Sequence, residues 1–390
     1  MLGLAVSGGG DSVALLHLAV EAGLTVEVAT VDHGLRPEAA DEAAAVAAAC
    51  AGLGVAHEVL RWHWDGRGNL QDAARRGRLA LLSGWAARRG LAGVALGHTR
   101  DDVAETFLMR LARDAGVDGL AAMAARREVG GVTFLRPMLG IGRTELRGWL
   151  LARGLGWAED ASNADGRFQR VRARRAVAAM EEVGVGAGAI AALASRMAEV
   201  RDALDAVTAE AAARVARLDR GDVILDAAGL AALPQEVRRR LVLAALRWIG
   251  SAEYGPRGAE VERFLRALSD GRAATLGGVR LTAGPGRLRL TREARAVAGV
   301  TAAPGEVWDG RWLVSGPDSN GLTVRALGEK GLLSCPGWRG VAVPRLSLIA
   351  SPAIWRGEAL LAAPLAGFGA GWRADCTPPQ GVLAAAPLSH

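Results

Sequence analysis

Short apolar runs alternate with helix-like patterns over the first 115 residues of the chain. Apolar runs of this length are typical of buried strands, and the spacing of apolar residues between them is typical of helices. Strands joined by helices in this way predict right-handed crossovers and an α/β fold with a doubly wound parallel sheet. We expect strands at 2–6, 24–31, 55–60 and 91–97, and helices at 11–22, from 37 to 52 or 54, at 70–89 and at 101–114.

Ligands of such sheets bind beyond the carboxyl ends of the strands. This rule places a candidate site at residues 7–12, 32–36 and 97–102.

The alternation of strand-like and helix-like segments does not continue after Pro137. A glycine-rich break at 183–188 precedes a long alanine-rich helix that we expect to end near Leu218. Helices are expected to continue through Leu268, and short β-like runs separated by Gly and Pro follow. The expected domains are an α/β domain at 1–185, a helical middle domain at 186–298 and a small β-rich C-terminal domain at 299–390.

Arginine supplies almost all of the positive charge. Lys and Arg together number 47 against 41 Asp and Glu, and Lys330 is the only lysine. Because a Walker A loop needs lysine followed by Ser or Thr, and glycine follows Lys330, ordinary P-loop NTPases are excluded. Two explanations of the arginine excess stay open, namely a genome rich in arginine codons or contacts with phosphate and nucleic acid.

The three cysteines, Cys50, Cys335 and Cys376, are too widely spaced for a disulfide framework or a CxxC metal unit. The N-terminus lacks the basic and long apolar regions of a signal peptide, and no apolar run reaches the ~20 residues of a membrane span. We therefore expect a cytoplasmic protein without a membrane partner. The sequence gives no sign of an obligatory protein partner.

The motif SGGGDS lies directly between the first expected strand and the first expected helix. Three consecutive glycines let the backbone approach a ligand, and the loop amides, serine hydroxyls and helix N-terminus predict a site for phosphate oxygens. Asp11 is expected to bind a Mg²⁺ that bridges these phosphates. A dinucleotide-binding fingerprint would need glycine at Val13, and a GDS-type esterase would need a late Asp-x-x-His that the sequence does not show. The candidate residues are Ser7, Gly8, Gly9, Gly10, Asp11 and Ser12.

Polar residues also follow the second and fourth expected strands. Arg36 follows His33 after the second strand. It either neutralises the charge of a bound triphosphate or is a solvated arginine in the loop that leads into the next helix. His98 ends the fourth strand, and Asp102 and Glu105 lie in the first turns of the next helix. These carboxylates either complement the helix dipole or bind Mg²⁺ or an amine.

Further along that helix, Arg113 lies eleven residues after Asp102, about three helical turns, and is expected on the same face.

These motifs resemble the PP-loop family of ATP pyrophosphatases, whose signature is SGGxDS after the first strand. Further blocks are similar, in the same order, to one branch of that family, the tRNA(Ile)-lysidine synthetases. The resemblance covers most of residues 2–175 and weakens beyond 185. The chain departs from the branch's usual pattern at Leu79, Thr99 and Val171. The matching blocks are 31–43, 97–123, 136–150 and 159–170.

The resemblance implies an enzyme that cleaves ATP between its α- and β-phosphates and adenylates the C2 oxygen of a cytidine. That cytidine is the wobble base of an isoleucine tRNA with a CAU anticodon, and the ε-amine of free L-lysine then displaces AMP. The implied catalytic residues are Asp11, Asp102, Glu105 and Arg113, with Asp11 also as the metal ligand. The implied ATP-binding residues are Ser7, Gly8, Gly9, Gly10, Asp11, Ser12, His33, Arg36 and His98. The implied tRNA-binding residues are Arg75, Arg78, Arg167, Arg170 and Arg172, which as basic faces could also be merely solvated.

Two other functions compete with this one. A PP-loop tRNA thiolase making 2-thiocytidine would need paired cysteines, and the three cysteines are not paired in the sequence. A non-catalytic RNA-binding protein of the same fold would not need the intact SGGGDS, HGLR and DD-x-x-E motifs.

Overall fold

The structure is a computed structural model that describes residues 1–34, 38–64, 66, 69–159, 167, 169–251, 258–317 and 320–386. The chain divides into two compact units, Met1–Arg201 and Asp202–His390, and the boundary falls within the long helix α8 (Ala187–Val215). The three-domain division expected from the sequence stays a prediction.

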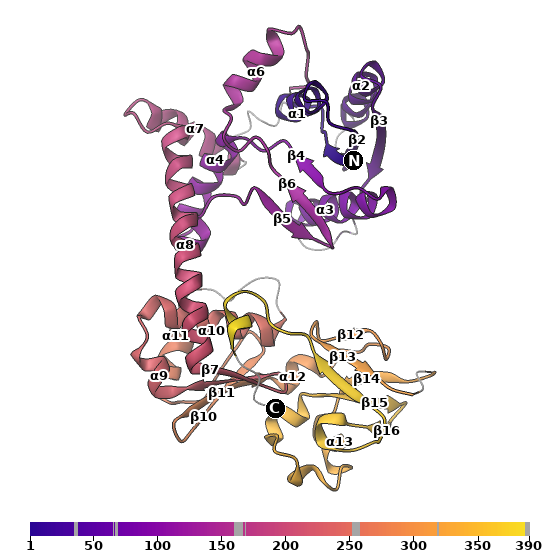
Figure 1. Cartoon of the computed structure of the whole chain (residues 1–390), viewed down its shortest axis with the longest axis vertical. Helices are drawn as coiled ribbons and strands as arrows, with labels where there is room; N and C mark the ends of the chain where they lie inside the picture. Colours follow the sequence, from indigo (N-terminus) through magenta and orange to yellow (C-terminus); the bar gives the residue numbers. More distant parts are fainter. Residues whose placement is uncertain are drawn as a thin grey trace. The chain divides into compact units, whose positions relative to one another are not determined.

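The first unit is built on a six-stranded sheet with the order β3-β2-β1-β4-β6-β5 (Figure 1). Five strands are parallel, and only the edge strand β5 runs antiparallel to its neighbour β6. The predicted α/β fold with a doubly wound parallel sheet is confirmed. The strands are β1 (Leu2–Ala5), β2 (Val26–Asp32), β3 (Ala56–Arg61), β4 (Val94–Leu96), β5 (Arg126–Val129) and β6 (Val132–Leu135).

The strand order reverses at β1, because the chain moves outward through β2 and β3 and then returns to add β4 on the other side of β1. A crevice forms beyond the carboxyl ends of the strands at such a reversal. The SGGGDS loop follows β1 and His98 follows β4, so both candidate segments lie at this point.

Helices cover both faces of this sheet. One apolar core joins β1 to α1, α2 and α6 through residues such as Leu16, Val46 and Leu150. A second core packs Leu82 and Trp85 of α3 against β2, β4 and β6. The helices of the unit are α1 (Gly10–Glu21), α2 (Glu38–Gly52), α3 (Leu70–Arg89), α4 (Arg100–Leu111), α5 (Val117–Leu120), α6 (Arg143–Leu151), α7 (Gln169–Glu181) and the first part of α8.

A third core holds α7 and α8 against α4, with Phe107, Val177 and Ile190 among its members. This core places the arginine-dense helix α7 next to α4, the helix that follows β4.

The predicted helix at 70–89 coincides with α3, whose N-cap Asn69 accepts a hydrogen bond from the backbone N–H of Asp72.

The second unit contains a five-stranded sheet, β7-β8-β11-β10-β9, and two three-stranded sheets, β12-β13-β17 and β14-β15-β16. Its helices are α9 (Ala227–Ala232), α10 (Gln235–Gly250), α11 (Gly258–Ser269), α12 (Ala294–Val297), α13 (Gly328–Leu333) and α14 (Arg345–Ile349). The strands are β7 (Ala216–Asp219), β8 (Asp222–Asp226), β9 (Ala274–Leu276), β10 (Val279–Gly284), β11 (Arg287–Arg292), β12 (Val307–Trp308), β13 (Trp312–Ser315), β14 (Thr323–Ala326), β15 (Pro352–Arg356), β16 (Ala359–Ala362) and β17 (Arg373–Cys376). Among the described residues, no helix is both long and apolar enough to cross a membrane.

The expectation of helices from 186 through Leu268 is wrong at β7 and β8, which form an antiparallel hairpin. Arg220 and Gly221 both have positive φ, 48° and 85°, and this geometry is typical of a tight two-residue hairpin turn. The turn ends the helical run and starts the five-stranded sheet.

Gly97 provides a test of how tightly the loop after β1 is held. A Cβ at this position would lie 3.0 Å from the backbone oxygen of Asp11 and 3.1 Å from the Cα of Ser12. We expect Gly97→Ala to displace the start of α1, to destabilise the protein by about 1–3 kcal/mol and to weaken ATP binding. Thermal unfolding and ATP titration measure both effects.

The matched control is Gly148→Ala in α6, where nothing lies within 4 Å of the added Cβ. This change should be neutral or stabilise by up to about 1 kcal/mol. Equal behaviour of the two variants would show that the contact between β4 and α1 does not hold the loop.

Candidate active site

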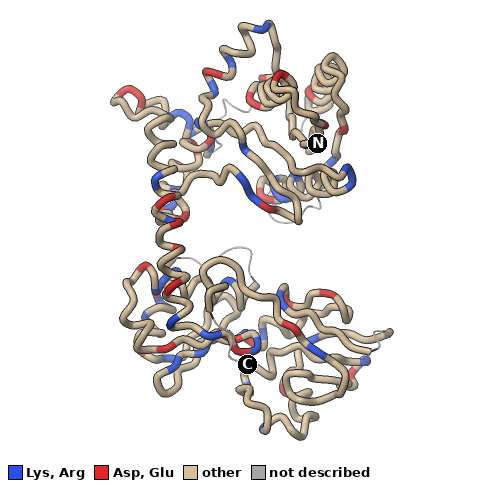
Figure 2. The backbone as a smooth tube through the Cα atoms, in the orientation of Figure 1, with Lys and Arg blue, Asp and Glu red and all other residues tan. Residues whose placement is uncertain are grey.

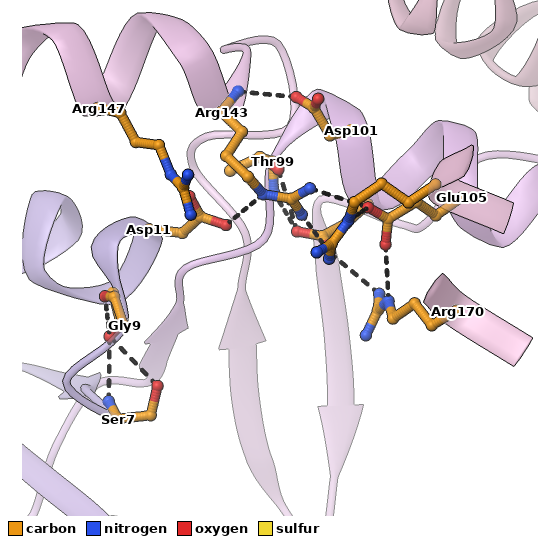
Figure 3. A network of polar contacts seen from close by, with 12 residues as sticks. Ser7, Gly9, Asp11, Thr99, Asp101, Glu105, Arg143, Arg147 and Arg170 are labelled. Carbon is orange, nitrogen blue, oxygen red and sulfur yellow. Dashed lines mark hydrogen bonds and ion pairs between the residues drawn. The ribbon is translucent and has the colours of Figure 1, made fainter. Parts of the chain in front are cut away.

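The SGGGDS loop forms a compact turn between β1 and α1. Gly8 has φ +89°, in the left-handed region that favours glycine. The Ser12 hydroxyl donates to the Gly9 carbonyl at 2.8 Å and accepts from the Ser7 N–H at 3.1 Å (Figure 3). A Cβ at Gly10 would lie 3.4 Å from the Trp157 ring. Backbone conformation therefore favours glycine at position 8, and the small size of Gly10 lets the Trp157 ring pack directly on the loop.

A cavity of about 1130 Å³ opens at this loop. It is lined by residues at the carboxyl ends of three strands, including Ser7, His33 and His98, and by side chains from α3, α6 and α7. Its volume exceeds that of a typical small-molecule site, so a nucleotide and part of a second substrate can share it.

Arg143, the first residue of α6, connects three carboxylates beside the cavity. Its Nε lies 3.1 Å from Asp11, its Nη1 lies 2.8 Å from Glu105 and its Nη2 lies 3.3 Å from Asp102 (Figure 3). Its backbone N–H donates to Asp101 at 2.7 Å. One guanidinium thus links the first turn of α1 to the first turns of α4.

Two arginines of α7 complete the cluster. Arg170 lies 3.0 Å from Asp102 and 2.9 Å from Glu105, and the Nε of Arg174 lies 3.0 Å from Glu105. Glu105 is only 1% exposed and contacts all three guanidinium groups. Such pairing is needed because a buried carboxylate without a partner is strongly destabilising. Figure 2 shows basic segments on α7 and on β5 of this unit.

The carboxylates differ in their pKa shifts. Burial raises the pKa of Asp11 above its usual value, although Arg143 acts in the opposite direction. Burial also acts to raise the pKa of Asp102, but Arg170, the Thr99 N–H and Arg143 outweigh it and lower that pKa. Asp102 is thus held as a carboxylate, whereas a ligand cation near Asp11 would favour its charged form.

Thr99, a departure from the family pattern, caps α4. Its N–H and its hydroxyl both donate to Asp102, at 2.8 and 3.1 Å. These bonds fix the carboxylate against the helix N-terminus. Val171, a second departure, is buried in α7.

Two histidines have ring nitrogens that face no protein partner. The Nδ1 atoms of His33 and His98 are buried and accept or donate no hydrogen bond within the described chain. Burial lowers the pKa of His98 to about 4, so its imidazole is neutral near pH 7. His33 packs edge-on against Trp62, with ring centroids 5.6 Å apart. Both rings line the cavity and fit a ligand that supplies the missing hydrogen bonds.

A second cavity of about 420 Å³ adjoins the arginine–carboxylate cluster. Arg143 and Arg174 line both cavities, and Glu105 lines the second. The cluster can therefore be approached from two directions.

The structure brings most of the predicted residues together. Ser7, Gly9, Gly10, Asp11, Ser12, His33, Arg78, His98, Asp102 and Arg170 line the main cavity, and Gly8 lies within the same loop. Arg36 lies outside the described residues. The other predicted tRNA-binding residues are exposed, namely Arg75, Arg167 and Arg172.

Arg113 forms no ion pair with the carboxylates of the cluster within the described residues. The helix ends at Leu111, earlier than expected, because Asp114 turns the chain with φ 56°. The exposed Arg113 side chain donates to Gln169 instead.

Sequence patterns alone did not point to Arg143, Arg147 or Trp157. Arg143 and Arg147 lie in the family block 136–150, which was the available signal.

A metal ion here would depend on the substrate for most of its ligands. No group of three or more His, Cys, Asp or Glu side chains in the described part of the chain could hold a metal ion. Mg²⁺ often binds through one or two carboxylates and substrate phosphates, and Asp11 beside the phosphate loop fits this arrangement.

Comparison with known proteins identifies the family. A PP-loop domain model matches residues 1–181. The chain is 50% identical over 394 residues to the tRNA(Ile)-lysidine synthase of Ruegeria pomeroyi, covering 100% of this chain and 94% of that protein. The chain belongs to the tRNA(Ile)-lysidine synthase family. It is also 41% identical over 303 residues to the synthase of a Methylobacterium species, covering 74% of this chain and 88% of that protein.

Among solved structures, a similar one is the U34-tRNA thiolase NcsA of Methanococcus maripaludis. It is 18% identical with a TM-score of 0.45, over 51% of this chain and 72% of that chain. This likeness is too distant to bear on the activity.

The shifted pKa of His98 predicts a pH dependence of stability. Its folded-state pKa of about 4 lies below the ordinary 6.5, so the unfolded chain binds the proton first as the pH falls. The stabilising effect of neutral His98 is complete above pH 6.5 and is lost progressively towards pH 4. Between pH 7 and 4.5, we expect the wild type to lose about 2 kcal/mol more stability than His98→Asn. Denaturant titrations across this range measure it, and parallel curves would contradict the assignment.

Proposed function

We propose that this chain ligates L-lysine to C2 of the wobble cytidine in an isoleucine tRNA with a CAU anticodon. The C2 oxygen of the cytidine attacks the α-phosphate of ATP, giving an adenylated cytidine and pyrophosphate. The ε-amine of lysine then attacks C2, AMP leaves with the oxygen, and the amine loses a proton. Membership of the lysidine synthase family, with the phosphate loop and carboxylate cluster at one cavity, supports this function most strongly.

The residues of the cavity suit the ATP half of the reaction. The amides and hydroxyls of the loop from Ser7 to Ser12 would bind phosphate oxygens, and His33 and His98 offer unused ring nitrogens. We assign Mg²⁺ binding to Asp11, where the ion would neutralise phosphate charge. Arg143, 3.1 Å from Asp11, would orient that carboxylate.

The carboxylates of α4 suit the lysine half. We propose that Asp102 and Glu105 hold the ammonium group and that one of them accepts its proton before attack on C2. Both carboxylates already bind cationic side chains, since Arg170 contacts Asp102 and Glu105 and Arg174 contacts Glu105. A lysine ammonium carries the same positive charge as these guanidinium groups. Because the side chains of Arg170 and Arg174 are 45% and 37% exposed, they can move away to admit a substrate amine. We propose that lysine reaches Glu105 through the second cavity.

The tRNA contacts are proposals from charge. Arg75, Arg78, Arg167, Arg170 and Arg172 are the candidates on the first unit, and we propose that the second unit adds further contacts. We place the enzyme in the cytoplasm, which stays a prediction from the sequence. No role is assigned to Arg113, since its side chain donates to Gln169 and forms no ion pair with a carboxylate among the described residues.

The thiolase alternative is disfavoured by the cysteines. Cys50 and Cys335 are buried, and burial raises the pKa of the Cys50 thiol to about 11. A thiol of this kind is protonated near pH 7 and is a poor nucleophile or metal ligand.

Mass spectrometry of nucleosides tests the reaction directly. A CAU-anticodon isoleucine tRNA is incubated with enzyme, ATP and lysine and then digested. We expect a cytidine heavier by one lysine less one water, whereas a sulfur-for-oxygen shift would indicate thiolation. Asp11→Asn is the matched low-activity control. Its rate of lysidine formation should be lower by roughly 10²–10³ because a charged ligand of the metal ion is lost.

Glu105→Gln tests the lysine site. The substitution keeps the shape and removes the charge, so the KM for lysine should rise at least tenfold while ATP binding changes little. Steady-state kinetics with each substrate varied in turn measures this split. The control is Glu145→Gln, which lines the same second cavity but pairs with Arg100 at 2.6 Å. Unchanged lysine dependence in Glu105→Gln would remove Glu105 from the amine site.

A further inference from the structure

A group of arginines near the main cavity has no acidic partner. Within the described residues, Arg75, Arg78 and Arg136 form no ion pair with a carboxylate, unlike Arg143 and Arg170. Arg136 is only 8% exposed, and its Nε is buried without a hydrogen-bond partner. The Nε of Arg78 is likewise buried and unpartnered.

The charged neighbours of these arginines are themselves cationic. The pKa of Arg78 is lowered by burial and then by Arg75, Arg170 and Arg136. Burial, followed by Arg127 and Arg75, lowers the pKa of Arg136. Such a group is electrostatically unfavourable in the free protein.

The group lies at the ligand-binding edge of the sheet. Arg78 lines the main cavity with His98, and Arg136 directly follows β6, the parallel neighbour of β4. Both arginines lie close enough to His98 to lower its pKa, and the Nδ1 of His98 also lacks a partner. Three buried nitrogen atoms without partners therefore gather on the α3 and β6 side of the cavity.

A structural role accounts for a nearby arginine but not for this group. Arg110 donates to the carbonyls of Gly119 and Ala121, at 2.8 and 3.3 Å, and so closes the end of α5. Arg136 makes one such bond, to Ala124 at 2.6 Å. For Arg78, no hydrogen bond to a described residue accounts for the guanidinium.

We propose that Arg78 and Arg136, supported by Arg75, form a second anion site that takes one backbone phosphate of the tRNA substrate. This inference rests on the proposed function and adds Arg136 and a buried, single-phosphate geometry to it. The phosphate loop after β1 already provides donors for the ATP phosphates, whereas Arg78 comes from α3, on another wall of the same cavity, and Arg136 directly follows β6. A guanidinium fork matches phosphate oxygens and would hold the nucleotide chain while the base reaches the cavity.

Arg78→Gln and Arg136→Gln test the site. Each substitution should weaken tRNA binding roughly tenfold and reduce the slope of log affinity against log salt by about 0.7–0.9, the value of one lost phosphate contact. Affinity for ATP should change less than twofold. Thermal stability of Arg78→Gln should be unchanged or higher, because a buried unpaired charge is removed.

Arg110→Gln is the matched control, since it removes one nearby arginine whose bonds are structural. It should keep the wild-type salt slope and unfold at a lower temperature. An unchanged salt slope in Arg78→Gln and Arg136→Gln would overturn the proposal, as would an equal loss of ATP affinity, which would assign the group to ATP phosphates. The proposed function is judged separately, by whether the wild type forms lysidine at all.

Discussion

The ion pairs of Arg143 with Asp11, Asp102 and Glu105 are the interaction on which the site depends. They join the helix that starts at the phosphate loop to the helix that carries the other carboxylates. Only 15% of the Arg143 side chain is exposed, so loss of the guanidinium would leave buried carboxylates with too little compensating charge. Desolvation lowers the pKa of Arg143, but its carboxylate partners outweigh this and raise it, so the group stays charged. The relative position of phosphate loop and carboxylates is thus fixed electrostatically as well as by packing.

Much of the sheet and of the phosphate loop could be predicted because their signals are local. Each strand and helix of the first 115 residues has its own apolar pattern, and the glycines of SGGGDS are neighbours in the chain. The hairpin of β5 and β6 was missed, although Gly130 and Gly131 between two β-like runs are a typical turn signal. The hairpin of β7 and β8 has a weaker turn signal, because its turn consists of Arg220 and a single glycine, Gly221, inside a helix-rich stretch.

The contacts within the site could not be predicted in the same way. Arg143 and Asp11 are 132 residues apart, and only the packing of α6 on α1 brings them together. Arg113 shows the opposite error, because helical spacing was extended past the true end of α4. Both cases have one cause: spacing within an element follows from the sequence, whereas contacts between elements follow from how they pack.

The structure also separates two explanations of the arginine excess. A bias in codon use would favour arginine at exposed positions, where Arg113 and Arg153 lie. It does not explain why Arg143 contacts three carboxylates, or why the Nε atoms of Arg78 and Arg136 are buried. A cation is rarely buried unless a partner compensates it. Arg143 has its partners within the protein, and the proposed tRNA phosphate would be the partner of Arg78 and Arg136. The buried arginines at this edge of the sheet therefore lie where carboxylates, or the proposed substrate phosphate, compensate their charge, whatever the origin of the arginines elsewhere.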